Sequence, residues 1–275
     1  VEAVRSLLAK DPPVEIVVVN SGGGGMAAKL RAAGIDVPVI EREERLYAGA
    51  VRNLGIAATR APFVGFLAAD CRAAPGWSRH RIDAHRAGVA TVASAVIPSH
   101  PRNPFAWASH LALFRRRLPR IGRQRAALYG ASYDRALFDE YGLFRGELRV
   151  GEDTEFHARL RPEHVPVWTP EVQAIHTSPT SFTAMLRDQY ARGRRASDSS
   201  WIVSGRRIPY GPNWAYVQVR TTIRMSRRAA GRKHKRTVRL AWLFLPFAVG
   251  AYALGGALAN RQRDKAGTPP GTDGR

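Results

Sequence analysis

Polar side chains stand directly after two apolar runs of this sequence, where the chain could meet a phosphate or a metal ion. Asn20-Ser21 follows "EIVVV", and Ala69-Asp70 follows "PFVGFLA". In open α/β sheets, ligands bind outside the carboxyl ends of the strands, and a carboxylate there can hold a divalent metal against a diphosphate. An Asp that ends a strand is also a common cap or turn residue. A diphosphate site and an ordinary turn are therefore both open at Asp70.

Four glycines, Gly22 to Gly25, connect the first of these runs to a helix-like segment. They do not match the G-x-G-x-x-G of dinucleotide folds, because Met26 stands where a last glycine is needed. They do not match a P-loop either, because Lys29 is misplaced. A pocket for part of a nucleotide and a flexible turn both remain possible for this loop.

The elements that must position these residues follow from alternating apolar and amphipathic segments. This alternation predicts βαβ units and an α/β fold with a mainly parallel sheet. The expected strands are 14–20, 37–41, 62–68 and 89–97, and the expected helices between them are 26–33, 48–59 and 76–87. Beyond residue 100, the patterns predict helices over 103–118 and 178–197, a helix start at "GEDTEF", and short strands at 165–168 and 171–176. Ser178 or Thr180 is the expected cap of the helix over 178–197.

The length and the cysteine count narrow the class of protein. A chain of 275 residues can form one substantial domain with an appendage. The single cysteine, Cys71, excludes a disulfide within the chain and is typical of a reducing compartment, and no Cys/His spacing resembles a zinc site. The chain begins at Val1, within a helix-like segment and with no signal-like stretch before it, so we expect either an unusual start or a missing upstream piece.

The charge and the apolar residues are concentrated toward the C-terminus. Residues 201–275 hold 15 Lys/Arg and 2 Asp/Glu, whereas residues 1–200 hold 28 and 20. The basic run lies directly before the uncharged stretch "LAWLFLPFAVGAYALGGALA", 240–259. Twenty residues at about 1.5 Å each can cross a hydrocarbon core of about 30 Å. We therefore expect 240–259 to insert into a membrane as a spanning, re-entrant or interfacial helix.

The basic run has two possible partners, membrane lipids and nucleic acid. Residues 220–239 hold nine Lys/Arg, against Arg261, Arg263 and Lys265 on the far side of the apolar stretch. By the positive-inside rule, this asymmetry predicts that residues 1–239 stay on the cytoplasmic side of a cell membrane. Nucleic acid is the weaker alternative, because the run adjoins the apolar stretch and has few aromatic residues that could stack on bases.

Three stretches, in this order and spacing, resemble the family 2 glycosyltransferases of GT-A fold, which transfer a sugar from a nucleotide-diphosphate donor. "VVVNSGG" is similar to a family strand whose end contacts the base, and "AGAVRNLGIAATRAPFVGFLAADC" to the unit that ends in the metal motif Asp-x-Asp. "YGASYDRALFDEYGLFRGELRVGEDTEFHARL" looks like the acceptor segment that ends in Glu-Asp. The resemblance covers Val1 to about residue 200, and the family's first strand would precede Val1.

The resemblance implies roles for three acids. Asp70 stands at the last position of Asp-x-Asp and would ligate Mg²⁺ or Mn²⁺; Ala68 replaces the first acid, which leaves one carboxylate with phosphate and water oxygens. Asp153 would be the general base that takes the proton of the acceptor hydroxyl, and Glu152 would orient the acceptor or the base. "GEDTEF" is also an ordinary helix start rich in acids.

The resemblance further implies donor contacts, each with a plainer alternative. Asn20 and Ser21 would meet the base and ribose, and Arg52-Asn53 the donor phosphate or base, unless they belong to a solvated helix face. His176 would meet diphosphate or metal, unless it is an ordinary strand-end histidine. Gln189, Arg192 and Arg194 are similar to the Gln-x-x-Arg-x element of membrane-associated members, but without its following Trp they do not predict a processive polymerase.

The resulting hypothesis is a cytoplasmic glycosyltransferase domain, 1–200, joined by a basic linker, 201–239, to the membrane helix, 240–259, and a disordered tail, 260–275. Its expected partners are a nucleotide-sugar donor, a lipid-linked or glycan acceptor and membrane lipids, and the resemblance implies inversion at the sugar. Two other classes stay open: a catalytically silent relative that serves as a binding or scaffold subunit, which Ala68 favours, and a basic nucleic-acid-binding protein.

Overall fold

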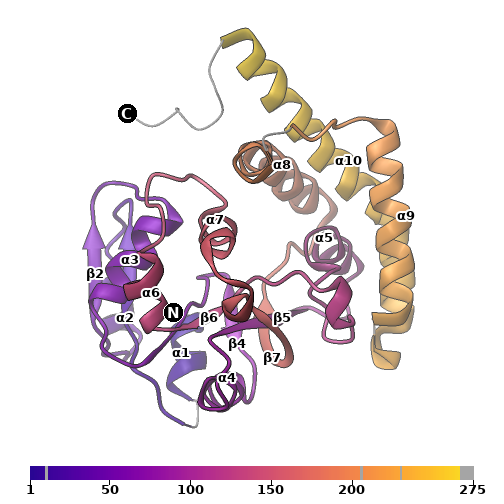
Figure 1. Cartoon of the computed structure of the whole chain (residues 1–275). Coiled ribbons are helices and arrows are strands. Elements are labelled where there is room, and N and C mark those ends of the chain that lie inside the picture. The colour runs from indigo at the N-terminus through magenta and orange to yellow at the C-terminus, as the bar shows by residue number, and fades with distance from the viewer. Residues whose placement is uncertain (10–11, 205–206, 230, 267–275) are drawn as a thin grey trace. The chain divides into compact units, whose positions relative to one another are not determined.

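The computed structural model describes residues 1–9, 12–204, 207–229 and 231–266, with the backbone alone at 198–204, 228 and 266. The chain forms two compact units (Figure 1). Unit 1 comprises Val1–Ala95 and Leu128–Ala174, and unit 2 comprises Val96–Ala127 and Ile175–Arg275. The boundary falls within two strands, β5 (Thr91–Pro98) and β7 (Val167–His176).

Unit 1 begins with the predicted alternation of helices and strands. Its first half contains α1 (Glu2–Leu8), β1 (Val18–Ser21), α2 (Met26–Ala32), β2 (Val39–Arg42), α3 (Ala48–Ala57), β3 (Phe63–Gly65), β4 (Cys71–Ala73) and α4 (Trp77–Arg86). Its second half contains β6 (Ser132–Asp134), α6 (Ala136–Tyr141), α7 (Glu152–Arg159), the short 3-10 helix η2 (Pro162–His164) and the start of β7. β1 and β2 pair in parallel, with α2 against β2 and α3 against β1 (Figure 1).

The larger sheet differs in direction from the expected one. Its five strands follow the order β3-β6-β5-β7-β4, and β6 runs antiparallel to both β3 and β5. A parallel neighbour needs a crossover that is usually helical, whereas β6 is entered from the irregular segment 126–131. The α/β class is therefore confirmed, and the sheet is mixed, because β6 runs against both of its neighbours where the sequence predicted mainly parallel strands. The predicted strands 165–168 and 171–176 are one continuous strand, β7.

An aromatic core in unit 1 fixes the second half of this unit. The core consists of four buried rings, with centroids 4.9–5.8 Å apart in tilted or edge contacts. They are Tyr133 of β6, Phe138 of α6, Phe144 of the loop before α7, and Phe156 of α7. Such pairs stabilise beyond the area that they bury. The core therefore holds α7, which carries the predicted catalytic acids, against the sheet.

Unit 2 is largely helical. It contains α5 (Pro104–Phe114), η1 (Arg123–Arg125), α8 (Phe182–Ser204), α9 (Pro212–Ala229), η3 (Arg232–His234) and α10 (Lys235–Ala266). α10 packs against α8, α5 and α9 (Figure 1). The crossing of α8 and α10 is close because glycines form it: a Cβ added to Gly193 would overlap the carbonyl oxygen of Tyr252, and one added to Gly255 would overlap that of Tyr190.

The structure refines four expectations for the C-terminal part. The basic linker, 201–239, is mainly helix, because Tyr216, Val219 and Ile223 recur at helical spacing within the charged residues of α9. The helix expected over 240–259 lies within α10, which continues to Ala266 without the chain reversal of a re-entrant hairpin. Residues 260–266 of the expected disordered tail are therefore helical, and 267–275 lie outside the described residues. At the start of α8, the hydroxyl that accepts from a backbone N–H is that of Ser181, from Ala184 at 3.4 Å, not that of Ser178 or Thr180.

Candidate active site

The predicted catalytic pair lies at the first turn of α7. Gly151, at φ 87°, turns the chain into the helix in a left-handed conformation that favours glycine. Glu152 follows and is 6% exposed, whereas Asp153 is half-buried. The backbone N–H of Thr154 donates to Oδ1 of Asp153 at 2.8 Å. Acids in the first turn are favoured by the helix dipole, so the local sequence explains why both carboxylates are stable here.

Arg52 of α3 forms an ion pair with Glu152 beside the aromatic core. Its Nη1 lies 2.7 Å from Oε1 of Glu152. The guanidinium also lies over the rings of Phe66 and Phe144, at 5.3 and 5.4 Å from their centroids. Burial raises the pKa of Glu152, and Arg52 partly offsets this by favouring the charged form. Arg52 therefore acts on the acid beside Asp153, although the sequence predicted a donor contact for it.

The neighbouring Asn53 fastens the loop that leads to α7. Its Nδ2 donates to the carbonyl oxygen of Phe144 at 2.8 Å, and the N–H of Phe144 donates to its Oδ1 at 3.1 Å. In the same region, a Cβ on Gly49 would lie 2.5 Å from the carbonyl oxygen of Arg145, so this loop requires glycine in α3. These bonds give Asn53 a positioning role, and its predicted contact with the donor stays a prediction.

Two residues that the sequence did not single out lie beside the candidate base. His157 is four residues after Asp153, hence on the same face of α7. Its Nε2 lies 2.8 Å from the hydroxyl of Tyr133, and its ring stacks with that of Tyr129 at a centroid distance of 6.4 Å. Burial lowers the pKa of His157 to about 4, against the opposing effect of the Asp153 charge. Burial also raises the pKa of Tyr133. His157 is thus neutral at pH 7, and the i, i+4 spacing of an acid and a histidine was the available signal.

Asp70 lies in an exposed turn between β3 and β4, not at the last residue of a strand. β3 ends at Gly65, and the N–H of Cys71 donates to the carbonyl oxygen of Ala68 at 2.9 Å, which closes the turn. In the described parts of the chain, no group of three His, Cys, Asp or Glu side chains could hold a metal ion. A lone exposed carboxylate fits a metal of the Mg²⁺ type that takes its other ligands from substrate phosphates and water.

The polar groups of the loop after β1 form hydrogen bonds within unit 1. Gly22 to Gly25 all have positive φ, from 60° to 98°. The N–H groups of Gly22 and Gly23 donate to the carbonyl oxygen of Arg42 at 3.0 and 3.2 Å, and Nδ2 of Asn20 donates to that of Gly23 at 2.8 Å. Oε1 of Glu41 accepts from the N–H of Ala27 at 3.0 Å, so a carboxylate of this chain already occupies the N-terminus of α2. This arrangement does not resemble a phosphate-gripping loop; the side chains of Asn20 and Ser21 are half-buried.

His176 belongs to unit 2, at the end of β7. Its ring is 3% exposed and packs against those of Phe114 and His110, at centroid distances of 4.8 and 6.4 Å. Its Nδ1 lies 3.1 Å from the hydroxyl of Ser178. These contacts are those of a buried strand-end histidine, and its predicted contact with donor or metal stays a prediction.

The structure thus brings together one part of the predicted set. Arg52, Asn53, Glu152 and Asp153 meet where α3, the loop at Phe144 and α7 come together. Asn20 makes its side-chain bond within the loop after β1, and Asp70 lies in the turn between β3 and β4. A buried ion pair that fixes an acidic helix start, with a half-buried carboxylate next to it, can hold a general base at a defined point.

Comparisons with solved structures find proteins of similar fold. A mannosyltransferase from Pyrobaculum calidifontis, PcManGT, solved in complex with GDP-Man and Mn²⁺, is similar in structure, with 16% identity and a TM-score of 0.55 over 94% of this chain and 82% of that one. Two structures of residues 1–349 of TarS from S. aureus are less similar. The complex with UDP has 14% identity and a TM-score of 0.48, over 97% of this chain and 87% of that one. The complex with UDP-GlcNAc has 12% identity and a TM-score of 0.49, over 96% and 87%.

At these identities the structures show the fold alone. No curated protein matches this sequence at a significant level. The family model described as "Glycosyl transferase family 2" matches residues 1–140, which is about half of the chain. Together with the GT-A-like fold, this match establishes that the chain belongs to glycosyl transferase family 2.

Proposed function

We propose that this protein transfers a sugar from a nucleotide-diphosphate donor to the hydroxyl of an acceptor, with Asp153 as the general base. One observation carries the proposal: Asp153 lies next to a buried glutamate that Arg52 holds by an ion pair of 2.7 Å. The pair anchors the first turn of α7 and so fixes the carboxylate that must meet the acceptor hydroxyl.

The proposed reaction is a single displacement at the anomeric carbon. Asp153 accepts the hydroxyl proton as the acceptor oxygen forms its bond to this carbon, and the bond to the departing nucleoside diphosphate breaks. An attack opposite the leaving group inverts the configuration of the sugar. Glu152 does not take the proton, because Arg52 occupies Oε1 of its carboxylate; it orients the turn that carries Asp153.

A divalent metal, when bound, supplies positive charge to the diphosphate of the leaving group. Asp70 is the residue of this chain that would hold it, from the turn that Ala68 and Cys71 close. Asn20 and Ser21, at the end of β1, would shape the pocket for the base and ribose. These roles are proposals that follow from the family's motif.

Unit 2 is proposed to hold the enzyme at the cytoplasmic face of a membrane, where a lipid-linked or glycan acceptor would be presented. The helical segment Arg232–Lys265, which comprises η3 and all of α10 except its last residue, is long and apolar enough to cross a membrane by length and composition. The basic residues before it would stay on the cytoplasmic side, where nucleotide sugars are made.

A donor panel tests the proposal. Purified full-length protein is offered GDP- and UDP-sugars with Mn²⁺ or with EDTA, and the release of nucleoside diphosphate is measured. GDP-Man is the first donor to test, because PcManGT was solved in complex with it. We expect release from at least one donor, and loss of the difference between Mn²⁺ and EDTA in Asp70→Ala. Equal release by Asp70→Ala in both conditions, with a wild type that needs Mn²⁺, supports the metal role; a variant that keeps the Mn²⁺ requirement removes Asp70 from the site.

A silent scaffold subunit is the second candidate, favoured by the single carboxylate in the metal turn where the family has two. It predicts donor binding in calorimetry without release from any donor. Release that depends on Asp153 contradicts it.

A further inference from the structure

The surface of unit 2 has a strong excess of positive charge. By sequence, unit 2 contains 26 Lys/Arg and 4 Asp/Glu, and residues 199–263 contain no acid at all. On most protein surfaces, neighbouring acidic side chains neutralise the field of the basic ones. Here they face a region without acids, so the site that they form is complementary to an anion.

Five of these side chains surround one hollow of about 490 Å³ between α9, η3, α10 and the segment before η1. They are Arg120, Arg227, Arg232, Lys235 and Arg239. All five are exposed, and no ion pair joins any of them to an acid within the described residues. None belongs to the candidate catalytic set.

We call this hollow the Arg-rich hollow. Contacts of Trp242, which also lines it, hold its side chains in place. Trp242 donates from Nε1 to the hydroxyl of the buried Ser226 at 3.0 Å. The guanidinium of Arg227 lies over the Trp242 ring, 5.4 Å from its centroid. Arg227 is therefore held at the edge of the hollow with its N–H donors available for an oxygen-rich anion such as a phosphate.

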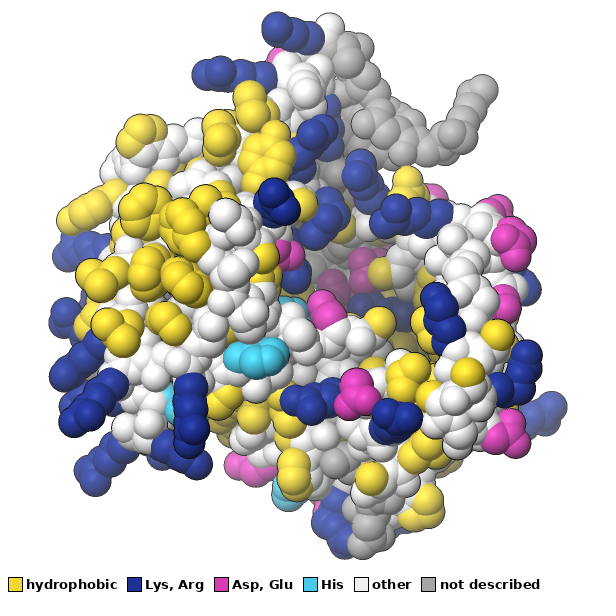
Figure 2. Space-filling model, turned by 180° about the vertical axis from the view of Figure 1, so that it is seen from behind, with side chains coloured by type: hydrophobic (Ala, Val, Ile, Leu, Met, Phe, Trp, Pro, Cys, Tyr) yellow, Lys and Arg dark blue, Asp and Glu magenta, His cyan; other side chains and the backbone are white. Residues whose placement is uncertain are grey.

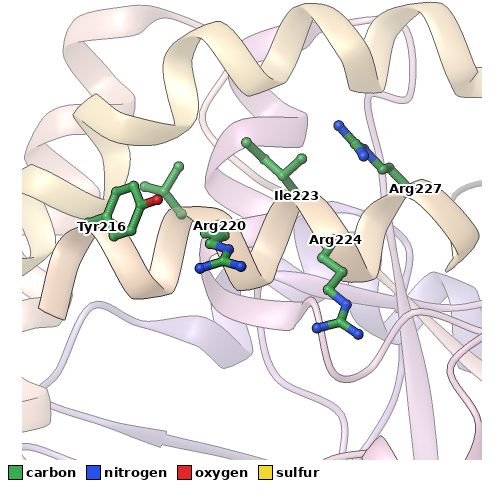
Figure 3. A pocket seen from close by; sticks show the side chains of 6 residues that line it. Tyr216, Arg220, Ile223, Arg224 and Arg227 are labelled. Atoms are coloured by element: carbon green, nitrogen blue, oxygen red, sulfur yellow. The ribbon is translucent and has the colours of Figure 1, made fainter. Parts of the chain in front are cut away.

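A second hollow, of about 560 Å³, continues the same surface along α9. Figure 3 shows the side chains that line it along this helix: Arg220, Arg224 and Arg227 alternate with Tyr216 and Ile223. Arg227 lines both hollows. Guanidinium groups thus alternate with apolar and aromatic groups, as on helices that lie at the boundary between lipid headgroups and acyl chains.

An apolar stripe on α10 starts where the Arg-rich hollow ends. Leu240, Leu243, Phe247 and Leu254 recur at spacings of three, four and seven residues and are 53–65% exposed. Figure 2 shows hydrophobic side chains gathered over the helices of unit 2, with Lys and Arg side chains at the border. An exposed apolar area with a basic border fits a surface that is both apolar and anionic.

We propose that the Arg-rich hollow binds the phosphate of an anionic phospholipid headgroup, while the α10 stripe inserts among the acyl chains beside it. The inference rests on the membrane attachment in the proposed function, but not on the transfer chemistry. It assigns α9 and α10 to the plane of the membrane surface. Charge complementarity selects the occupant, because an anionic bilayer offers phosphates and acyl chains at adjacent depths.

The packing of α10 favours lying in the membrane surface over spanning. In the most apolar part of this helix, 39% of the residues are buried inside the protein. The middle of α10 crosses α8 at Gly193 and Gly255, next to the ion-paired Asp188 and Arg192. A spanning α10 that kept this crossing would place these charges in hydrocarbon, which is unfavourable even for an ion pair. In the membrane surface, α8 stays in water while the stripe enters the lipid.

Vesicle flotation tests the headgroup site. Full-length protein, synthesised in the presence of vesicles, is floated with neutral phosphatidylcholine or with vesicles containing phosphatidylglycerol. The test variant is Arg227→Gln/Arg232→Gln/Arg239→Gln. The control, Arg123→Gln/Arg125→Gln/Arg187→Gln, removes the same charge from exposed positions outside the hollow. We expect the test variant to bind the anionic vesicles about a hundredfold more weakly, and the control to lose much less.

Four outcomes overturn the proposal. Equal losses in both variants would assign the binding to net charge rather than to this hollow. Full binding to neutral vesicles would show that the anionic headgroup is not required. Competition by free glycerol 3-phosphate, without recruitment to vesicles, would identify a soluble phosphate ligand. Tighter binding of single-stranded DNA than of vesicles, lost in the same test variant, would assign the surface to nucleic acid.

Cysteine labelling separates the two orientations. Lys233→Cys and Arg261→Cys, each with Cys71→Ser, place a thiol near either end of α10. A membrane-impermeant maleimide is added outside sealed vesicles to which the protein has bound from outside. We expect both positions to react, because both ends lie on one side. Protection of Arg261→Cys alone would show a spanning helix and refute the orientation in the membrane surface.

Discussion

The two units of this protein use charge in opposite ways. Unit 1 contains 17 Lys/Arg and 18 Asp/Glu, whereas unit 2 contains 26 and 4, so the net charge of +21 belongs to unit 2. In unit 1, ion pairs connect α3 to α7 through Arg52 and Glu152, and α6 to the segment after α7 through Glu140 and Arg161 at 2.7 Å. A third pair, Arg159 with Glu155 at 3.0 Å, lies within α7. In the described part of unit 2, the ion pairs are Arg192 with Asp188 and Arg207 with Asp264. Charge positions side chains in unit 1 and remains on the surface in unit 2.

From this difference we expect sugar transfer to depend on unit 1 and the binding of anionic surfaces to depend on unit 2. Balanced, partly buried pairs hold a reactive group at a fixed point, at the cost of desolvation. Unbalanced, exposed cations contribute little to the fold and give the surface an affinity for anions. Substitutions in one unit should therefore change one activity and leave the other, and each prediction below tests that separation.

The largest effect is expected for Asp153→Asn. Asparagine keeps the shape and the hydrogen bond from Thr154 but cannot take a proton. Transfer should fall by about 10² to 10⁴-fold, while donor binding and binding to anionic vesicles stay near those of the wild type. Turnover and calorimetry on the same preparation measure both quantities.

The control for this prediction is Asp83→Asn, an exposed aspartate of α4 in the same unit. It removes the same charge, and transfer should be unchanged. Transfer that survives in Asp153→Asn would make Asp153 an ordinary helix-start acid. An equal loss of vesicle binding would break the separation of the two units.

A smaller effect is expected for Gly193→Ala in unit 2. The new methyl group would overlap the carbonyl oxygen of Tyr252, so α8 and α10 must separate. Overpacking of this kind costs about 1–3 kcal/mol, and its control is Gly250→Ala, where a Cβ meets nothing within 4 Å. In calorimetric unfolding, Gly193→Ala should lower the midpoint of unit 2 and spare donor binding. Equal midpoints for both variants would show that this crossing is not tight.

The order of elements in unit 1 could be predicted because local patterns determine it. β1, α2, β2 and α3 begin and end within a few residues of the predicted bounds, since each is an apolar run or an amphipathic segment between glycine, proline or polar residues. The direction of β6 could not be predicted. It depends on how the chain returns from unit 2, which no short-range pattern encodes.

The acids of the candidate site could be predicted from the sequence, but the residues that hold them in place could not. Asp153 and Glu152 were found because their motif is contiguous in sequence. For Arg52 the family resemblance implied a donor contact, which stays a prediction, whereas its ion pair with Glu152, 100 residues away, leaves no sign in the local sequence. Asn53 and Tyr133 likewise gain their contacts only from tertiary packing. In α9, the sequence indicated a linker because its charge obscured the apolar periodicity.

Acidification should destabilise unit 1 through His157. Burial lowers its pKa to about 4 from an ordinary value near 6.5. The folded state thus favours the neutral ring, and the stability that this provides is complete above pH 6.5 and is lost as the pH falls toward 4. At pH 5 the loss is about 2 kcal/mol. Thermal unfolding at pH 7.5 and 5 measures it.

His157→Gln tests the assignment, because glutamine can still bond to the hydroxyl of Tyr133 but does not titrate. This variant should flatten the pH dependence of the unit 1 transition. It should not alter that of unit 2, where burial lowers the pKa of His110 to about 3. An unchanged slope for unit 1 would mean that another buried group, such as His85, determines it.

The smallest effect is expected for Glu41→Gln, at the N-terminus of α2. Oε1 of Glu41 accepts from the N–H of Ala27 at 3.0 Å, so unit 1 satisfies even this helix end with its own carboxylate. Glutamine keeps an acceptor oxygen and removes the charge, which should cost about 0.3–1 kcal/mol through the helix dipole. Differential scanning calorimetry at low salt and at 0.5 M salt measures the change, which should shrink with salt because the carboxylate is exposed. A donor affinity that rises in Glu41→Gln would show that the carboxylate competes with a phosphate at this helix end. The loop after β1 would then hold phosphate after all, and unit 1 would share with unit 2 the use of exposed charge for binding an anion.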